Sequence, residues 1–118
     1  MTGELIRRAI ATNSTSTSQE MEIPYGTTLV GVEIPVEATS TTFNITHAAK
    51  SGGTFLTLKD PLGIYGTAGN AINFTIGATS LGIFMIPPSV SALLYSRMQI
   101  ILSNAETAAV TLIFKQIA

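Results

Sequence analysis

Residues 41–60 read TTFNITHAAKSGGTFLTLKD, and this stretch decides the fold class. In its first half, Phe43 and Ile45 alternate with threonine and asparagine, which is the period-two pattern of a half-buried strand. The adjacent glycines of the SGG segment reach positive φ without steric cost, so they predict a tight turn. Residues 54–60 then run back as a second strand, which Pro61 ends. The stretch therefore predicts an antiparallel β-hairpin.

The same alternation recurs along most of the chain. Strand-like runs bounded by turn residues or prolines occupy residues 20–23, 28–34, 41–48, 54–60, 71–76, 81–86, 97–102 and 109–117. Short strands at regular spacing, without a long amphipathic helix, are typical of all-β sandwiches and barrels. We therefore predict an all-β, antiparallel sandwich of about eight strands with a jelly-roll-like arrangement. An immunoglobulin-like sandwich is the alternative.

Two segments near residue 85 carry more specific expectations. Residues 81–86 are apolar nearly throughout, which indicates a strand covered on both faces. Ser89 follows two prolines and can cap a short helical turn through residues 90–95.

Residues 62–70 contain three spaced glycines and are expected to form a long loop. Because a strand follows that loop instead of a helix, its glycines do not predict a phosphate-binding motif.

The N-terminal segment differs in composition from the rest. Residues 13–18 read NSTSTS, and six small polar side chains bury too little apolar area to offset the entropy lost on ordering. We assign residues 1–18 to an N-terminal arm or linker and residues 19–118 to the sandwich domain. The segment can be a flexible linker, a long hairpin turn with a strand beginning at residues 8–12, or an arm that orders against a neighbouring subunit.

The chain is poor in charge. It has 118 residues, of which 11% are charged, and a net charge of −1, whereas charged residues make up about a quarter of a typical domain. Without a basic stripe, the composition argues against nucleic acid as a partner. Threonine and serine supply the polar surface, and buried protein interfaces are similarly depleted in charge. We therefore expect an assembly subunit that forms a homo-oligomer.

Composition also limits the cellular setting. The chain has no cysteine, so disulfides and thiolate metal sites are excluded, and assembly in the cytoplasm is compatible. No segment approaches the roughly 20 apolar residues of a membrane helix, so we expect no membrane partner. Residues 1–11 contain two arginines but no following apolar core, which is not the pattern of a signal peptide.

No group of side chains predicts catalysis, a metal or a cofactor. His47 is the single histidine and Asp60 the single aspartate, whereas a metal site needs several such ligands. We expect His47 to be half-buried or to lie at an interface. The close glutamate pairs lie at or near strand ends, where charges discourage unwanted strand pairing: Glu20 with Glu22, and Glu33 with Glu37. The nucleophile pattern Gly-x-Ser-x-Gly does not occur, so we predict that the protein is not an enzyme.

Ligand recognition is the remaining chemical possibility. Glycosylation sequons begin at Asn13, Asn44 and Asn73. Two of the three fall inside predicted strands, so we interpret them as accidental in a threonine-rich chain. The three tyrosines, Tyr25, Tyr65 and Tyr95, fall in predicted turns or loops, where a glycan-binding site can form. Of these, Tyr65 in the glycine-rich loop is the best candidate.

From residue 32 to the C-terminus, the order of elements resembles that of small virion proteins of tailed bacteriophages. The matching pieces are EIP at 33–35, TFNI at 42–45, SGGTF at 51–55, LKD at 58–60, FMIP at 84–87, RMQI at 97–100 and LSN at 102–104. The chain departs from this pattern in lacking a tryptophan after its Ile-Pro strand, and residues 1–18 have no clear counterpart.

The resemblance implies a virion protein with no catalytic residue. It implies a β-sandwich that decorates or cements a capsid, with the major capsid protein or other virion proteins as partners. Three-fold or six-fold capsid sites favour a trimer. The alternative is a tail- or fibre-associated domain that binds host surface glycans.

Overall fold

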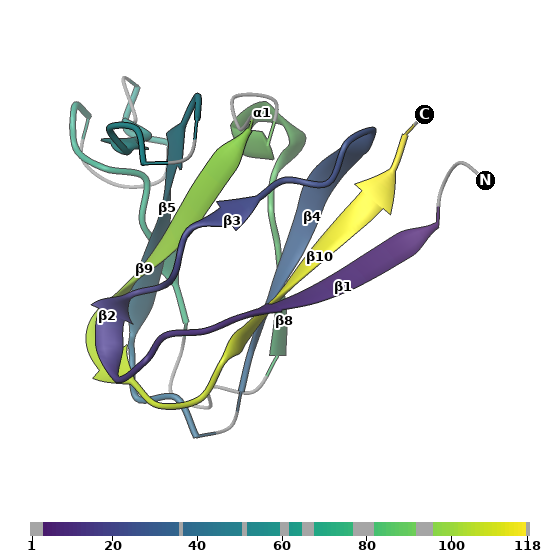
Figure 1. Cartoon of the computed structure of the whole chain (residues 1–118). Helices are drawn as coiled ribbons and strands as arrows, with labels where there is room; N and C mark the ends of the chain where they lie inside the picture. Colours follow the sequence, from purple (N-terminus) through teal and green to yellow (C-terminus); the bar gives the residue numbers. More distant parts are fainter. Residues whose placement is uncertain are drawn as a thin grey trace.

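The computed structural model describes residues 4–35, 37–50, 52–59, 62–64, 68–76, 82–91 and 96–117. These residues form ten strands and one helical turn (Figure 1). The elements are β1 (Leu5–Ile10), β2 (Thr15–Thr17), β3 (Met21–Glu22), β4 (Thr27–Ile34), β5 (Thr42–Ala48), β6 (Leu56–Thr57), β7 (Phe74–Thr75), β8 (Gly82–Met85), α1 (Pro88–Ser91), β9 (Arg97–Glu106) and β10 (Val110–Gln116).

The strands build two antiparallel sheets that pack as a sandwich. Sheet A has the order β1-β10-β4-β8. In sheet B, β9 and β5 are central, with β2 and β3 along the free side of β9 and β6 and β7 along the free side of β5. β2 and β3 thus occupy one position in sheet B, and β6 and β7 occupy another. When the eight resulting positions are numbered in chain order, sheet A reads 1-8-3-6 and sheet B reads 2-7-4-5. This is the order of a jelly roll, so the predicted fold class is confirmed.

The two strands beyond the predicted eight come from the segment that the sequence assigns to an arm or linker. β1 pairs with β10 over six residues, from Leu5 opposite Lys115 to Ile10 opposite Val110. Thr15 N donates to Thr12 O across the following turn. The two residues between them have left-handed φ values, as in the type I′ turns of hairpins. β2 then pairs with β9, so described residues of this segment supply an edge to each sheet.

Hydrogen bonding explains why this polar segment is ordered. The Thr12 hydroxyl is buried and donates to Glu106 O at 2.7 Å and Ala108 O at 3.1 Å. Ser18 Oγ accepts from Ile100 N at 2.9 Å, and Ser18 N donates to Ile100 O. Small hydroxyl side chains satisfy backbone groups here instead of burying apolar area. Composition alone does not reveal these partners, because they lie about 80 to 95 residues away in the chain.

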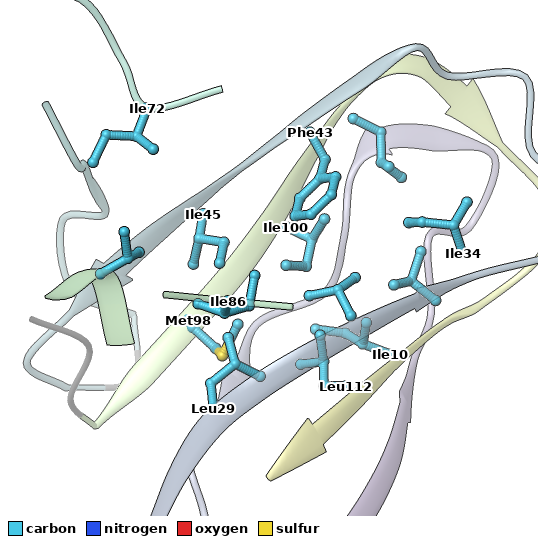
Figure 2. Close-up of a cluster of buried hydrophobic side chains, with 14 of the residues drawn as sticks. Ile10, Leu29, Ile34, Phe43, Ile45, Ile72, Ile86, Met98, Ile100 and Leu112 are labelled. Carbon is cyan, nitrogen blue, oxygen red and sulfur yellow. The ribbon is translucent and has the colours of Figure 1, made fainter. Parts of the chain in front are cut away.

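The hydrophobic core lies between the two sheets and draws on both (Figure 2). Phe43 of β5 is fully buried near its centre. Its ring stacks on Phe74 of the same sheet, with centroids 5.1 Å apart, and meets Phe84 of sheet A edge-to-face at 6.0 Å. Both are favourable aromatic geometries. The predicted inward phase of Phe43 and Ile45 is therefore confirmed, because both are buried in this core.

Three local expectations need correction. β8 is not covered on both faces, because Ile83 and Met85 point outward from the edge of sheet A and are exposed. The second strand of the hairpin, expected at residues 54–60, is short, because β6 spans only Leu56–Thr57. The helical turn begins at Pro88, one residue before the predicted cap, and residues 92–95 of the predicted turn lie outside the described residues.

Candidate interaction surfaces

His47 lies at the end of β5, opposite Met98 of β9 and Leu56 of β6, and is half-buried. It thus faces the same side of sheet B as Phe43 and Ile45, near the rim of the core. Among the described residues, no group of three or more histidines, cysteines or acids is placed to hold a metal ion. Asp60 lies outside the described residues.

Glu20 and Glu22 converge on one arginine. Arg97 Nε lies 2.9 Å from Glu20 Oε1, and Arg97 Nη1 lies 3.6 Å from Glu22 Oε2. Both Glu20 carboxylate oxygens also accept from Gly52 N at 3.3 Å, at a glycine with φ of 71°. This carboxylate therefore connects the turn after β5 to β9. Its hydrogen bonds are directed at its own chain, as expected of a structural ion pair.

Glu33 and Glu37 are not a pair in the structure. Glu33 lies on β4 and accepts from Arg7 Nη2 of β1 at 2.6 Å, across the intervening strand β10. Glu37 is exposed in the connection after β4. The Arg7 and Glu33 side chains are 52% and 30% exposed, and an ion pair this open to solvent contributes little to stability.

Sequence reasoning missed Glu106, a buried carboxylate at the end of β9. It is only 4% exposed and accepts from Thr39 N at 3.0 Å, Ser40 N at 2.7 Å and the Ser40 hydroxyl at 2.5 Å. Among the described residues, no lysine, arginine or histidine forms an ion pair with it. The sequence predicts a strand over residues 97–102, whereas β9 continues to Glu106. Its partners lie more than 60 residues away, so no local signal identifies them.

Tyr25 is the most exposed of the large side chains in the described residues. Thr27 N donates to Pro24 O at 3.2 Å, and Gly26 has φ of 74°. A glycine with positive φ at the third position is typical of a type II turn. The turn therefore projects Tyr25 away from the sandwich. Tyr65, which the sequence favours as a glycan contact, and Tyr95 lie outside the described residues.

The remaining sequence motifs fall in ordinary structural roles. Gly63 and Gly69 have φ values of 73° and 85°, as loop glycines do, while Gly66 lies outside the described residues. Asn44 Nδ2 donates to Asn73 Oδ1 at 3.1 Å, so two of the sequon asparagines bind each other. Asn13 is exposed in the turn that leads into β2.

The outer face of sheet B is polar, and its charged groups include Arg97 of β9, which lies opposite Glu22 of β3 at one end. Thr46 of β5 lies between Gln99 of β9 and Thr57 of β6, and Asn44 lies beside Ile101 of β9. Two buried atoms on this face, Asn44 Oδ1 and Thr46 Oγ1, have no hydrogen-bond partner. Bound water commonly satisfies such isolated groups. These atoms are inaccessible, so they offer no contact to a larger ligand.

The outer face of sheet A combines exposed apolar side chains with three charged ones, Arg7, Glu33 and Lys115. Its two central rows run across the sheet: Ala9, Thr111, Glu33 and Ile83 in one, and Arg7, Ile113, Gly31 and Met85 in the other. A Cβ atom on Gly31 would lie 3.1 Å from Ile83 Cγ2 and 3.6 Å from Ile113 Cδ1. The two isoleucines therefore approach each other over the bare glycine backbone.

Exposed apolar side chains lie at both edges of this face. Ile83 and Leu5 are each 60% exposed and Met85 is 78% exposed, at opposite edges of the same face. Large exposed apolar patches on soluble proteins often mark interaction sites. The described residues enclose no pocket, and small-molecule sites are normally concave. The exposed apolar side chains of this face are therefore a candidate surface for contact with another protein.

Comparison with known proteins gives no relative: no family model, curated protein or solved structure matches the chain. Within the described residues, the structure contains no helix long and apolar enough to span a membrane.

Proposed function

We propose that this chain is a non-enzymatic structural protein of a virion, most specifically a capsid decoration (cement) protein. The observation that carries the proposal is the group of exposed apolar side chains on the outer face of sheet A, with Ile83 and Met85 at its β8 edge. The order of elements that resembles small virion proteins of tailed bacteriophages supports the same conclusion. The partners are then the major capsid protein or other virion proteins, and the location is the virion.

The proposed mechanism is burial of this face across neighbouring capsid subunits. Separating the subunits then returns apolar surface to water, at about 25 cal/mol per Å², offset by the costs of association. The Arg7–Glu33 ion pair is already formed at 2.6 Å, so covering the face leaves neither charge unpaired. Capsid sites of three-fold or six-fold symmetry favour a trimeric form of the protein.

The first test is cryo-electron microscopy of the native particle, together with mass spectrometry of its proteins. We expect density for an all-β sandwich that bridges capsid subunits through the outer face of sheet A. A particle that lacks the protein excludes the proposal. Density that contacts the capsid only through sheet B excludes the assigned surface.

A binding experiment tests the surface directly. In re-addition to particles stripped of the protein, Met85→Lys should weaken binding by about tenfold, because a charge is then buried in an apolar contact. Leu62→Lys is the matched control, because Leu62 is also 78% exposed but lies in the loop after β6. Equal binding by both variants contradicts the proposed surface.

A second candidate is a tail- or fibre-associated domain that binds host surface glycans. Full exposure of Tyr25 favours it, because an open aromatic ring can pack against a sugar. A glycan array with the assembled protein and a Tyr25→Ala variant tests this candidate. Binding that the substitution abolishes supports it, and absence of binding by the unaltered protein counts against it.

A further inference from the structure

The two edges of sheet A are protected differently. β1, at one edge, carries Arg7 and Arg8, both exposed. Charged side chains of this kind are a common protection of edge strands against pairing with other chains. β8, at the other edge, reads Gly-Ile-Phe-Met and has no charge and no proline. Within the described residues, no strand pairs with its outer side.

The backbone of β8 presents an ordered set of hydrogen-bonding groups on that side. β8 pairs with β4 in antiparallel register, with Phe84 opposite Val32, and Ile86 N donates to Val30 O at 3.0 Å. In an antiparallel pair, alternate residues direct both backbone groups toward the partner. Phe84 and Ile86 are two residues apart, so the backbone groups of both point toward β4. The N–H and C=O groups of Ile83 and Met85 therefore point away from β4.

We propose that β8 pairs with β8 of a second copy, antiparallel and about a two-fold axis at Phe84. Ile83 then lies opposite Met85 of the partner subunit, and the same contact repeats on the other side of the axis. The two outward N–H groups of each copy meet the two outward C=O groups of the other, so all four outward groups of each copy are satisfied. The exposed Ile83 and Met85 side chains of both copies lie on one face as close cross-strand pairs.

The distribution of charged side chains favours pairing at β8 over pairing at β1, and it is compatible with a second copy as the partner. Equivalent pairing at β1 brings Arg7 and Arg8 toward their own copies, and like charges across strands are destabilising. At β8 the nearest charge on the outer face is Glu33 of β4. In the pair, the two Glu33 residues lie about three strand spacings apart, roughly 14 Å, which exceeds the screening length of about 8 Å. Each is also bound by Arg7 at 2.6 Å.

The size of the contact predicts a weak association. β8 contributes four residues, whereas a stable interface uses about 20 to 30 residues and about 800 Å² from each partner. We therefore expect a dimer that dissociates on dilution. A two-fold contact closes at two copies and cannot complete a trimer, so in a larger assembly it joins neighbouring oligomers. The contact requires no capsid, and a solution experiment tests it independently of the proposed function.

Sedimentation velocity over a concentration series tests the pairing. We expect reversible dimerisation of the unaltered protein, weakened by about tenfold or more in Ile83→Lys, because the lysines then flank the axis close to each other. Leu5→Lys is the control, because Leu5 is equally exposed on the same face but lies at the β1 edge. Circular dichroism verifies that both variants fold. A monomer at every concentration, or equal weakening by both substitutions, overturns the proposal.

Hydrogen exchange identifies the groups involved. The amides of Ile83 and Met85 should become protected as concentration rises, whereas the Phe84 amide, bonded toward β4, should be protected throughout. Protection of all three at every concentration indicates that a segment of the same chain covers the edge, which overturns the proposal. Rapid exchange of Ile83 and Met85 in a dimeric sample overturns it as well, because the dimer then uses another surface.

Discussion

Glu106 shows how one buried side chain can organise distant parts of this chain. Its carboxylate accepts hydrogen bonds from Thr39 and Ser40, and its own backbone carbonyl accepts from the Thr12 hydroxyl. The residue thereby connects the segment before β2, the connection before β5 and the end of β9. A buried carboxylate is stable in such a place because donors replace the water that it loses.

At this residue we predict that Glu106→Gln lowers the free energy of unfolding by about 2–3 kcal/mol. The amide group places donors where backbone N–H groups already donate, which leaves buried polar groups unsatisfied. Urea denaturation followed by circular dichroism measures the change. Glu37→Gln, at an exposed glutamate, is the control and should leave stability unchanged. Equal effects of the two substitutions contradict the structural role of Glu106.

At the scale of elements, strands with apolar alternation are predictable from sequence and the two N-terminal ones are not. β4, β5 and β10 follow apolar alternation closely, because each has one face in the core. β1 and β2 escape prediction because their stability comes from pairing with β10 and β9, far along the chain. β8 was located correctly, but its exposure depends on its position at the edge of sheet A.

The integration of β1 leads to a prediction about Ile10. This side chain is buried in the core, opposite Val110 of β10, so Ile10→Ala should lower the free energy of unfolding by about 2–5 kcal/mol. Leu5→Ala, in the same strand but at an exposed position, should have a much smaller effect. Thermal and urea unfolding compare the two. A mobile arm instead predicts that both substitutions are equally harmless.

At the scale of the whole molecule, the two outer faces are chemically distinct. The outer face of sheet B carries threonine, asparagine and glutamine, with Arg97 and Glu22 at one end. The outer face of sheet A carries exposed isoleucine, leucine and methionine beside Arg7, Glu33 and Lys115. Low charge in the sequence suggests an assembly subunit but does not say which surface assembles. The strand order places Leu5, Ile83 and Met85 on one face, and this is the face that we propose for assembly.

The topology also predicts slow folding. β1 pairs with β10, and β4 lies between β10 and β8, so the sheets require contacts between distant parts of the chain (Figure 1). Such topologies fold in milliseconds to seconds, because loop closure precedes the stabilising contacts. Stopped-flow refolding from urea measures the rate, at concentrations low enough to keep the protein monomeric. Refolding in microseconds contradicts this expectation.

The sequence by itself determined the fold class, most strand positions and the shortage of charge, because alternation of side chains and turn glycines are local properties. Only the tertiary structure decided that residues 5–17 belong to the sandwich, that Glu106 is buried and that β8 has no strand of the described residues on its outer side. Each of these depends on which distant strand lies alongside, and hydrogen bonds between distant residues leave no periodic signal in the chain.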